Sequence, residues 1–370
     1  MYTDNINVDD FIVPHEREKI KHIGGIILQE VKVAMIGFGG IAKSHKKGYE
    51  ILTAQGAAVR LVAICDVNPD AFTAVSQINL GSEKRADLSG IATYCDLDAM
   101  LENEEFDMAD ICVPSFLHAE IAVKMLRAGK HVLSEKPMAL RSADCERMLS
   151  VAKESGKRLM IGQCLRFEPS YLFLKRAIDS GEFGSLCHLS MTRLSPYPRW
   201  GFEGWYHNQE RSGGAIMDLH IHDIDMARFL LGEPKAVSTV AHDGITRWQY
   251  CNTRLYYPGL VVNATGSWDE AATVPFEAGF RARFEKASVV LSGANVTVYP
   301  DEGTVYHAVL PEVEAGRGNR MAEEIRHLVG LILAPEKENL QNPPESAAKT
   351  VALIETLRES ADANGKILSI

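Results

Sequence analysis

VKVAMIGFGGIA, residues 31–42, is the stretch of the chain that decides its fold. Its first six residues form an apolar run typical of a buried strand, and glycines follow it directly. Gly37 permits a tight turn, Gly39 lets the backbone approach a pyrophosphate, and Ala42 allows close packing of helix on strand. The N–H groups that open such a helix can bind phosphates. This context predicts a dinucleotide-binding loop rather than a glycine turn without a nucleotide, with contacts from Gly37, Phe38, Gly39, Gly40 and Ile41.

The first half of the chain alternates apolar runs with helical patterns. The expected strands are 31–36, 61–65, 109–113, 131–133 and 159–161. The expected helices are 41–52, 69–78, 118–128 and 142–155. Near-continuous apolar strands alternating with helices indicate a parallel sheet covered on both faces. We therefore expect a doubly wound α/β domain over residues 31–157, preceded by an arm of residues 1–30.

The second half has a different pattern, and we expect a second, α+β domain over residues 158–370. A helix over 169–180 precedes runs rich in Val, Thr, Tyr and Phe that turn residues separate. These runs predict a largely antiparallel open sheet, with strands at 186–192, 236–241, 248–256, 260–266, 279–284, 287–291 and 296–305. Helices should cover one side of that sheet, and one of them is expected over 342–364.

Composition and charge exclude several classes of protein. The chain has 370 residues, 46% hydrophobic and 24% charged, with a net charge of −10 at pH 7. The acidic balance argues against nucleic acid or an anionic membrane as partner, because both attract clustered Lys and Arg. The longest uncharged stretches, 255–268 and 287–300, are shorter than the roughly 20 residues that span a bilayer. Residues 1–22 lack the pattern of a secretory signal, and seven dispersed cysteines favour a cytoplasmic protein.

Asp66 ends the second expected strand and indicates which cofactor the loop prefers. A carboxylate there can accept hydrogen bonds from both ribose hydroxyls of the adenosine and repels a 2′-phosphate. Residues 67–69 contain no Arg or Lys that could hold such a phosphate. NAD is therefore favoured over NADP. A helix N-cap is the other interpretation of Asp66, and the two are compatible.

Glu135-Lys136-Pro137 follows the expected strand 131–133, where an open α/β sheet binds its ligands. A lysine at this place can contact both the nicotinamide ribose and a substrate hydroxyl, and its charge lowers the pKa of that hydroxyl. A surface salt bridge between Glu135 and Lys136 is the alternative interpretation.

Residues 213–225, GGAIMDLHIHDID, predict a helix in which Asp218, His222 and Asp225 share one stripe. A carboxylate beside an imidazole is the arrangement of a general base, because the carboxylate orients the ring and raises its basicity. The pH–rate profile should then show an ionisation near neutrality. A metal site that includes His220 is the alternative, but positions i and i+2 point to different faces of a helix, so we expect no metal.

Together these motifs resemble the glucose–fructose oxidoreductase/inositol dehydrogenase (Gfo/Idh/MocA) family. The resemblance extends from Val31 to Ile370 and rests on GFGGIAKSH, AICD, DICVPSFLHAEIAVKMLRAGKHVLSEKPMAL, GQCLRFEPSY, SGGAIMDLHIHDID and ESAAKTVALIETLRESADANGK. It implies an NAD(P)-dependent oxidoreductase that interconverts a secondary alcohol and a ketone on a sugar, polyol or related derivative by hydride transfer.

The resemblance also implies site residues. His222 would remove the hydroxyl proton, Asp218 would orient His222, and Lys136 would bind the reacting oxygen. The cofactor-side positions are Pro114, His118, Glu135, Lys136 and Gln163. The cleft and substrate candidates, besides the three catalytic residues, are Gln163, Arg166, Arg193, Trp205 and His207. His45 is expected to be structural, and His220 stands where the family often has glycine and could add a substrate contact.

Two other functions stay open at this stage. One is NAD-assisted lyase or glycosidase chemistry on a sugar, in which the cofactor oxidises the substrate transiently. The other is a non-catalytic regulator that senses nucleotides, although a sensor need not keep Lys136, Asp218 and His222. An antiparallel sheet covered on one side leaves an open face, so we expect a homodimer or homotetramer built through that face.

Overall fold

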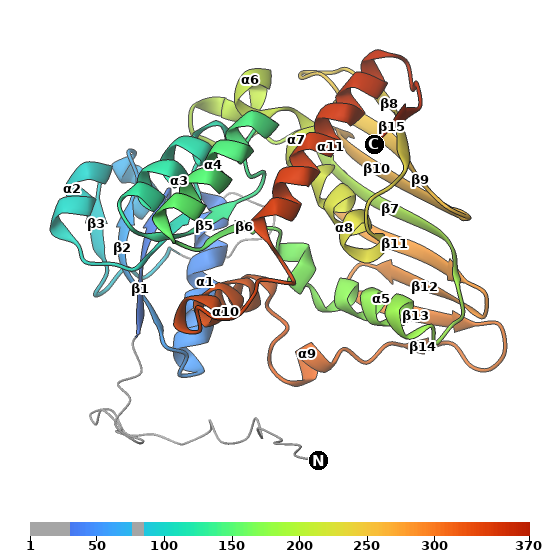
Figure 1. Cartoon of the computed structure of the whole chain (residues 1–370), viewed down its shortest axis with the longest axis horizontal. Helices are drawn as coiled ribbons and strands as arrows, with labels where there is room; N and C mark the ends of the chain where they lie inside the picture. Colours follow the sequence, from blue (N-terminus) through green and yellow to red (C-terminus); the bar gives the residue numbers. More distant parts are fainter. Residues whose placement is uncertain (1–29, 76–84) are drawn as a thin grey trace.

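The computed structural model describes residues 30–75 and 85–370, which form two sheets with their helices (Figure 1). Residues 1–29 of the expected arm lie outside this part, as does the end of the expected helix 69–78. Its beginning is a single 3₁₀ turn, Pro69–Phe72, rather than an α-helix. Among the described residues, no helix is both long and apolar enough to cross a membrane.

The first sheet confirms the predicted doubly wound domain. Its strand order is β3-β2-β1-β4-β5-β6, and neighbouring strands are parallel. The strands are β1 (Val31–Ile36), β2 (Val59–Cys65), β3 (Ala92–Tyr94), β4 (Met108–Ile111), β5 (His131–Glu135) and β6 (Leu159–Gly162). The helices are α1 (Gly40–Ala54), α2 (Leu97–Asn103), α3 (His118–Arg127) and α4 (Ser142–Ser155). The short β3 and α2 were not predicted from the sequence. The sheet extends past residue 157, because β6 pairs with β5.

The central strand β1 has four consecutive buried apolar residues, Val33 to Ile36, rather than an alternating pattern. Val33 and Met35 face a core shared with α1, whereas Ala34 and Ile36 face the core that contains α3 and α4. All four side chains are buried. Each face of the strand thus packs on a different helical layer, which is the reason that parallel strands have continuous rather than alternating hydrophobicity.

The second sheet has nine strands in the order β14-β13-β12-β11-β7-β10-β9-β8-β15. It is mixed rather than fully antiparallel, because β7 and β10 run parallel. The strands are β7 (Leu186–Pro196), β8 (Ala236–His242), β9 (Tyr250–Tyr257), β10 (Leu260–Glu270), β11 (Glu277–Phe284), β12 (Ala287–Ser292), β13 (Asn295–Pro300), β14 (Tyr306–His307) and β15 (Leu368–Ser369). The expected strand 296–305 ends at Pro300.

Helices cover one face of this second sheet, as predicted (Figure 1). The long helices on this side are α5 (Pro169–Ser180), α8 (Ile221–Leu231) and α11 (Pro344–Asp362). The short helices α6 (Gln209–Ser212) and α7 (Ala215–Asp218) lie between β7 and α8, and α9 (Pro311–Glu314) follows β14. Along β9, Cys251 and Leu255 are buried whereas Asn252 and Arg254 are exposed. This alternation is typical of a sheet with one covered and one open face.

The C-terminal part of the chain returns to the first domain. Helix α10 (Arg320–Leu333), which sequence analysis did not predict, packs against α1. The approach is close at Gly48, where a Cβ atom would lie 3.1 Å from the backbone nitrogen of Ala322. Helix α11 contacts α4, and its Glu355 accepts hydrogen bonds from the backbone N–H and hydroxyl of Ser142. These contacts fix the position of the second domain relative to the first.

Candidate active site

A cavity of about 620 Å³ lies between the two domains, beyond the carboxyl ends of the first sheet. Ile41, Val113, Ser115, His118, Glu135 and Lys136 line it from the first domain. The second domain contributes the larger share of the lining, including Arg193, Trp205, Asp218, His222 and Arg320. The size is that of an ordinary small-molecule site, and the position is where doubly wound sheets bind ligands.

The glycine loop between β1 and α1 fits a dinucleotide. Gly37 has a φ of +87°, and a Cβ atom there would lie 2.7 Å from the carbonyl oxygen of Cys112, so this position requires glycine. A Cβ at Gly39 would meet no atom within 4 Å, which means that its backbone borders open space. No side chain of residues 30–75 or 85–370 caps the N-terminus of α1, and the first turn of the helix contains no acidic residue. The helix start is therefore available to an anion such as a pyrophosphate.

Asp66 stabilises the glycine loop through hydrogen bonds to backbone N–H groups. Its Oδ2 accepts a hydrogen bond from the backbone N–H of Phe38 at 2.6 Å, and its Oδ1 accepts one from Asn68 at 2.8 Å. The N-cap of the following 3₁₀ turn is Asn68, whose side chain accepts from the N–H of Asp70. Asp66 is half-buried beside the phosphate loop. This location is the one that the ribose-binding interpretation requires.

Lys136 and Asp218 join the two domains across the cavity. The Lys136 ammonium donates to the Asp218 carboxylate at 2.9 Å and to the Asp218 carbonyl oxygen at 2.7 Å. The backbone N–H of Lys136 donates to the Glu135 carboxylate at 3.0 Å, so the preceding residue holds the turn. Lys136 is therefore paired with Asp218 rather than with Glu135, which was the alternative in the sequence.

His222 stands in α8, beyond a break in the helix that the sequence predicted as continuous. Helix α7 ends at Asp218 and α8 begins at Ile221. Among the described residues, the Asp218 carboxylate bonds to Lys136 and not to His222. The Nδ1 atom of His222 is buried and lacks a hydrogen-bond partner there. The carboxylate–imidazole contact expected from the i, i+4 spacing is thus absent from the described part of the molecule.

The surroundings of His222 keep its imidazole neutral. Burial, followed by the positive charges of Lys136, Arg193 and Arg320, holds the pKa of His222 well below its usual value of 6.5. A neutral imidazole can accept a proton at pH 7. The expected ionisation near neutrality is therefore displaced to lower pH.

The other cations that line the cavity are paired with carboxylates. Arg193 donates to Asp223 at 3.0 and 3.2 Å, and its partner is fully buried. Arg320 donates to Glu168 at 2.9 Å. Together with the Lys136 pair, these contacts leave the described lining of the cavity rich in hydrogen-bonding groups but without a cluster of unpaired positive charge.

Behind the glycine loop lies a buried network centred on His45. Its Nδ1 is 3.0 Å from an Asp110 oxygen, and its Nε2 is 2.9 Å from Glu135 Oε1. Burial alone would lower the pKa of His45, but Asp110 raises it well above 6.5. The same imidazole lowers the pKa of Glu135 against the effect of burial. Through these contacts His45 connects α1 to the turn that carries Lys136.

Not every predicted residue reaches the cavity. The Arg166 guanidinium, only 3% exposed, binds the Asp225 carboxylate at 2.7 and 2.8 Å, so burial and pairing withdraw it from the substrate. His220 is fully buried and bonds to Thr253 at 2.9 Å, pointing into the second sheet. His207 packs against the Tyr197 ring, with centroids 5.0 Å apart.

Three residues predicted to lie on the cofactor side differ in their surroundings. Both ring nitrogens of His118 lie near carbonyl oxygens, Pro137 at 2.7 Å and Val113 at 2.9 Å, so it ties the β4 and β5 loops together. Pro114 precedes the 3₁₀ turn Ser115–Leu117. Gln163, at the end of β6, is buried, and its Nε2 lacks a partner among the described residues.

Sequence reasoning missed several residues that line the cavity, above all Glu168, Trp200, Tyr206, Trp268, Phe276 and Arg320. The segment 197–207, YPRWGFEGWYH, could have drawn attention because five of its residues are aromatic Tyr, Trp or Phe. No such local cluster of residues pointed to Arg320, and the helix that carries it was not predicted. Arg320 reaches the cavity because α10 packs against α1 of the first domain.

Comparison with known proteins identifies the family. A family model described as "Oxidoreductase family, NAD-binding Rossmann fold" matches residues 31–163, and the "GFO/IDH/MocA C-terminal domain" model matches residues 171–305. The two models together cover most of the chain. The chain belongs to the Gfo/Idh/MocA oxidoreductase family, and residues 31–163 form its NAD-binding Rossmann domain.

Similar proteins include two sugar or polyol dehydrogenases. Inositol 2-dehydrogenase of Rhizobium meliloti is 34% identical over 213 residues, 57% of this chain and 58% of that protein. Levoglucosan dehydrogenase of Pseudarthrobacter phenanthrenivorans is 28% identical over 221 residues, 58% and 54% of the two chains. The chain therefore covers less than two thirds of the length of these relatives.

Solved structures share the fold. A levoglucosan dehydrogenase in complex with NADH superposes with a TM-score of 0.78 at 20% identity, covering 92% of this chain and 99% of that one. The match includes both domains and confirms the predicted fold class. At this identity it shows the fold alone.

Proposed function

We propose that the protein is an NAD-dependent dehydrogenase that interconverts a secondary alcohol and a ketone on an uncharged sugar or polyol. The observation that carries this proposal is a neutral imidazole, His222, in the same cavity as the Lys136–Asp218 pair. This combination provides a proton acceptor and a hydrogen-bond donor at the carboxyl end of β5. A purely structural role for the cleft would need neither.

In this proposal Lys136, His222 and Asp218 have different roles in the reaction. Lys136, anchored by the Asp218 carboxylate and carbonyl, donates to the reacting oxygen and favours its deprotonated form. His222 accepts the hydroxyl proton at Nε2, since its Nδ1 is buried. In this scheme Asp218 positions Lys136 rather than His222. NAD, when bound, would accept the hydride, and the glycine loop with Asp66 would hold its pyrophosphate and ribose.

Two observations support an uncharged, polyhydroxylated substrate. The cations Arg193 and Arg320 are each neutralised by a carboxylate, which leaves no strong site for a substrate anion among the described lining residues. Two of the similar proteins are named for inositol and levoglucosan, both rich in hydroxyl groups. Trp205 lies in the lining and adds apolar surface for a ring.

Substrate screening with NAD tests this function directly. A panel of hexoses, inositols, alditols and neutral disaccharides is assayed for NADH by absorbance, and the proposal predicts steady NADH formation with at least one of them. Sugar acids and sugar phosphates serve as the charged comparison and should react more slowly. NADH formation with none of the neutral compounds would refute the proposal.

We also propose a homodimer or homotetramer that pairs the open face of the second sheet. Val261, 50% exposed, and Tyr299, 45% exposed, are large apolar side chains on strands of this sheet. Val261→Arg should dissociate the assembly, which light scattering measures as a lower molecular mass. A monomeric wild type at micromolar concentration would contradict this proposal.

We also propose a cytoplasmic location, supported by seven free cysteines.

A further inference from the structure

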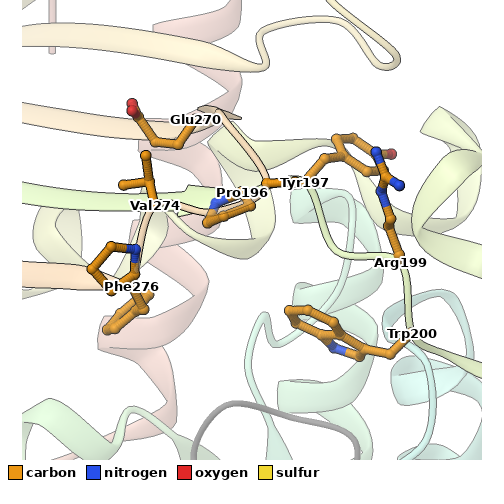
Figure 2. A pocket seen from close by; sticks show the side chains of 9 residues that line it. Pro196, Tyr197, Arg199, Trp200, Glu270, Val274 and Phe276 are labelled. Atoms are coloured by element: carbon orange, nitrogen blue, oxygen red, sulfur yellow. The ribbon is translucent and has the colours of Figure 1, made fainter.

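A second cavity of about 640 Å³ opens beside the candidate active site. Its lining comes from two segments, the end of β7 with the residues after it and the loop that joins β10 to β11. Figure 2 shows Tyr197, Arg199 and Trp200 along one side of this cavity and Glu270, Val274 and Phe276 along the other, with Pro196 between them. None of these seven residues is among the site residues predicted from the sequence.

The two cavities adjoin each other. Trp200 and Phe276 line both of them, so a ligand in one borders the other across these two rings. Phe276 is 39% exposed, although it is a large apolar side chain, and Trp200 is half-buried. Aromatic side chains that line a concave surface together with a few polar groups are typical of small-molecule sites.

The walls of the second cavity are held in place. Pro196 and Glu270 are partners where β7 and β10 run parallel, which fixes the two segments to each other. The Tyr197 hydroxyl donates to the carbonyl oxygen of Tyr206 at 2.8 Å, and the Tyr197 ring packs edge-on against Trp268. The aromatic side of the cavity is therefore preorganised, which reduces the entropy lost when a ligand binds.

The polar groups of this cavity have opposite charges. Arg199 offers N–H donors and Glu270 offers acceptor oxygens, and no hydrogen bond or ion pair occupies either side chain among the described residues. One cation opposite one carboxylate suits hydroxyl groups, which both donate and accept. It does not suit a phosphate or diphosphate, which calls for clustered cations or converging backbone N–H groups.

We propose that this second cavity is a subsite for a second, uncharged sugar ring, so that the natural substrate is a disaccharide or glycoside oxidised on its first ring. Trp200 and Phe276 would pack on the apolar faces of the sugar, while Arg199 and Glu270 bind its hydroxyl groups. The proposal rests on the function proposed above and specifies its substrate class.

Calorimetric binding tests the subsite without requiring turnover. NAD-loaded protein is titrated with glucose and galactose as single rings, and with cellobiose, maltose and lactose as two-ring sugars. At least one two-ring sugar should bind at least tenfold more tightly than its component single ring. Equal or weaker binding of all three two-ring sugars would overturn the proposal, and so would tighter binding of UDP-glucose than of any of them.

Two neighbouring alanines provide a matched pair of variants. Ala271 and Ala272 are both exposed in the β10–β11 loop, but only Ala272 lines the cavity. Ala272→Trp should fill the subsite and remove the two-ring advantage while single-ring binding stays unchanged. Ala271→Trp should preserve both. The same result for both variants would contradict the assignment.

The assays separate this proposal from the proposed function. If a two-ring sugar binds with the predicted preference but no NADH forms, the dehydrogenase assignment fails and the subsite stands. If single-ring sugars are oxidised and no two-ring sugar binds more tightly, the subsite fails and the dehydrogenase assignment stands.

Discussion

Two histidines flank the Glu135–Lys136 turn, and their surroundings give them opposite protonation states. His45, from the first domain, lies between the carboxylates of Asp110 and Glu135, and its pKa is raised well above 6.5. His222, from the second domain, faces Lys136 and two arginines, and its pKa is lowered well below 6.5. Residue type alone did not distinguish them. The charged histidine stabilises the fold, and the neutral one is available for proton transfer.

The largest effect is expected from removing the neutral histidine. His222→Ala should lower kcat by about 10²–10⁴-fold, the usual contribution of a positioned base. NAD affinity should stay unchanged, because the glycine loop and Asp66 belong to the other domain. Steady-state kinetics and NAD titration measure the two effects. His207→Ala is the control, since His207 packs on Tyr197 outside the cavity lining, and equal losses in both variants would contradict the base assignment.

Removing the charged histidine should instead destabilise the protein. His45→Ala leaves Asp110 and Glu135 buried without their cation, which typically costs about 3–5 kcal/mol in the free energy of unfolding. The stabilisation is complete below about pH 6.5 and is lost as pH rises through the raised pKa of folded His45. Denaturant unfolding at pH 6 measures the loss. His242→Ala, a histidine 3.5 Å from Asp269 on the surface, should cost less than about 1 kcal/mol.

Glu324 is a buried acid whose carboxyl group lies in the electrostatic surroundings of His45, so it provides a third group for this comparison. Neither of its carboxyl oxygens has a hydrogen-bond partner among the described residues. Burial, followed by Glu135, raises its pKa well above 4.5, so the folded protein holds the extra proton. Stability should therefore fall as pH rises above about 4.5, by up to about 1.4 kcal/mol per pH unit. Glu324→Gln should gain stability relative to wild type between pH 5 and 8, and a constant difference would contradict the raised pKa.

The smallest effect concerns cofactor choice. Asp66→Ala removes a carboxylate that accepts the Phe38 N–H and would repel a 2′-phosphate. The preference for NAD over NADP should narrow about tenfold, roughly the strength of one hydrogen bond to a charged group. Fluorescence titration of both cofactors measures it, with Asp70→Ala as the nearby exposed control. Wild-type protein that binds NADP as tightly as NAD would refute the cofactor assignment.

Local sequence was enough to predict those parts of the site that lie within a single continuous segment of the chain. The glycine loop, Asp66 and the Glu135–Lys136 turn each follow a buried strand directly, so their place in the fold could be predicted. The same holds for α5 and α4, whose observed bounds match the predicted ones. These elements have strong periodicity and clear capping or turn residues at their ends.

Pairing between distant residues could not be predicted. Lys136 and Asp218 are 82 positions apart, and the helix break after Asp218 turned its carboxylate from His222 to Lys136. Arg166 follows β6 closely and therefore resembled a cleft residue. Its buried partner Asp225 lies 59 positions away, and only the folded structure brings them together. Tertiary contacts of this kind leave no local pattern.

The central claim is that His222 and Lys136 promote net hydride transfer from a sugar carbon to NAD. The most direct test uses a substrate from the neutral panel carrying deuterium at the carbinol carbon that is oxidised, with NMR analysis of the products. The account predicts that the deuterium appears on C4 of NADH, in amounts equal to the ketone formed. Deuterium retained in an eliminated or hydrolysed sugar, with no accumulation of NADH, would contradict it and would indicate lyase or glycosidase chemistry instead.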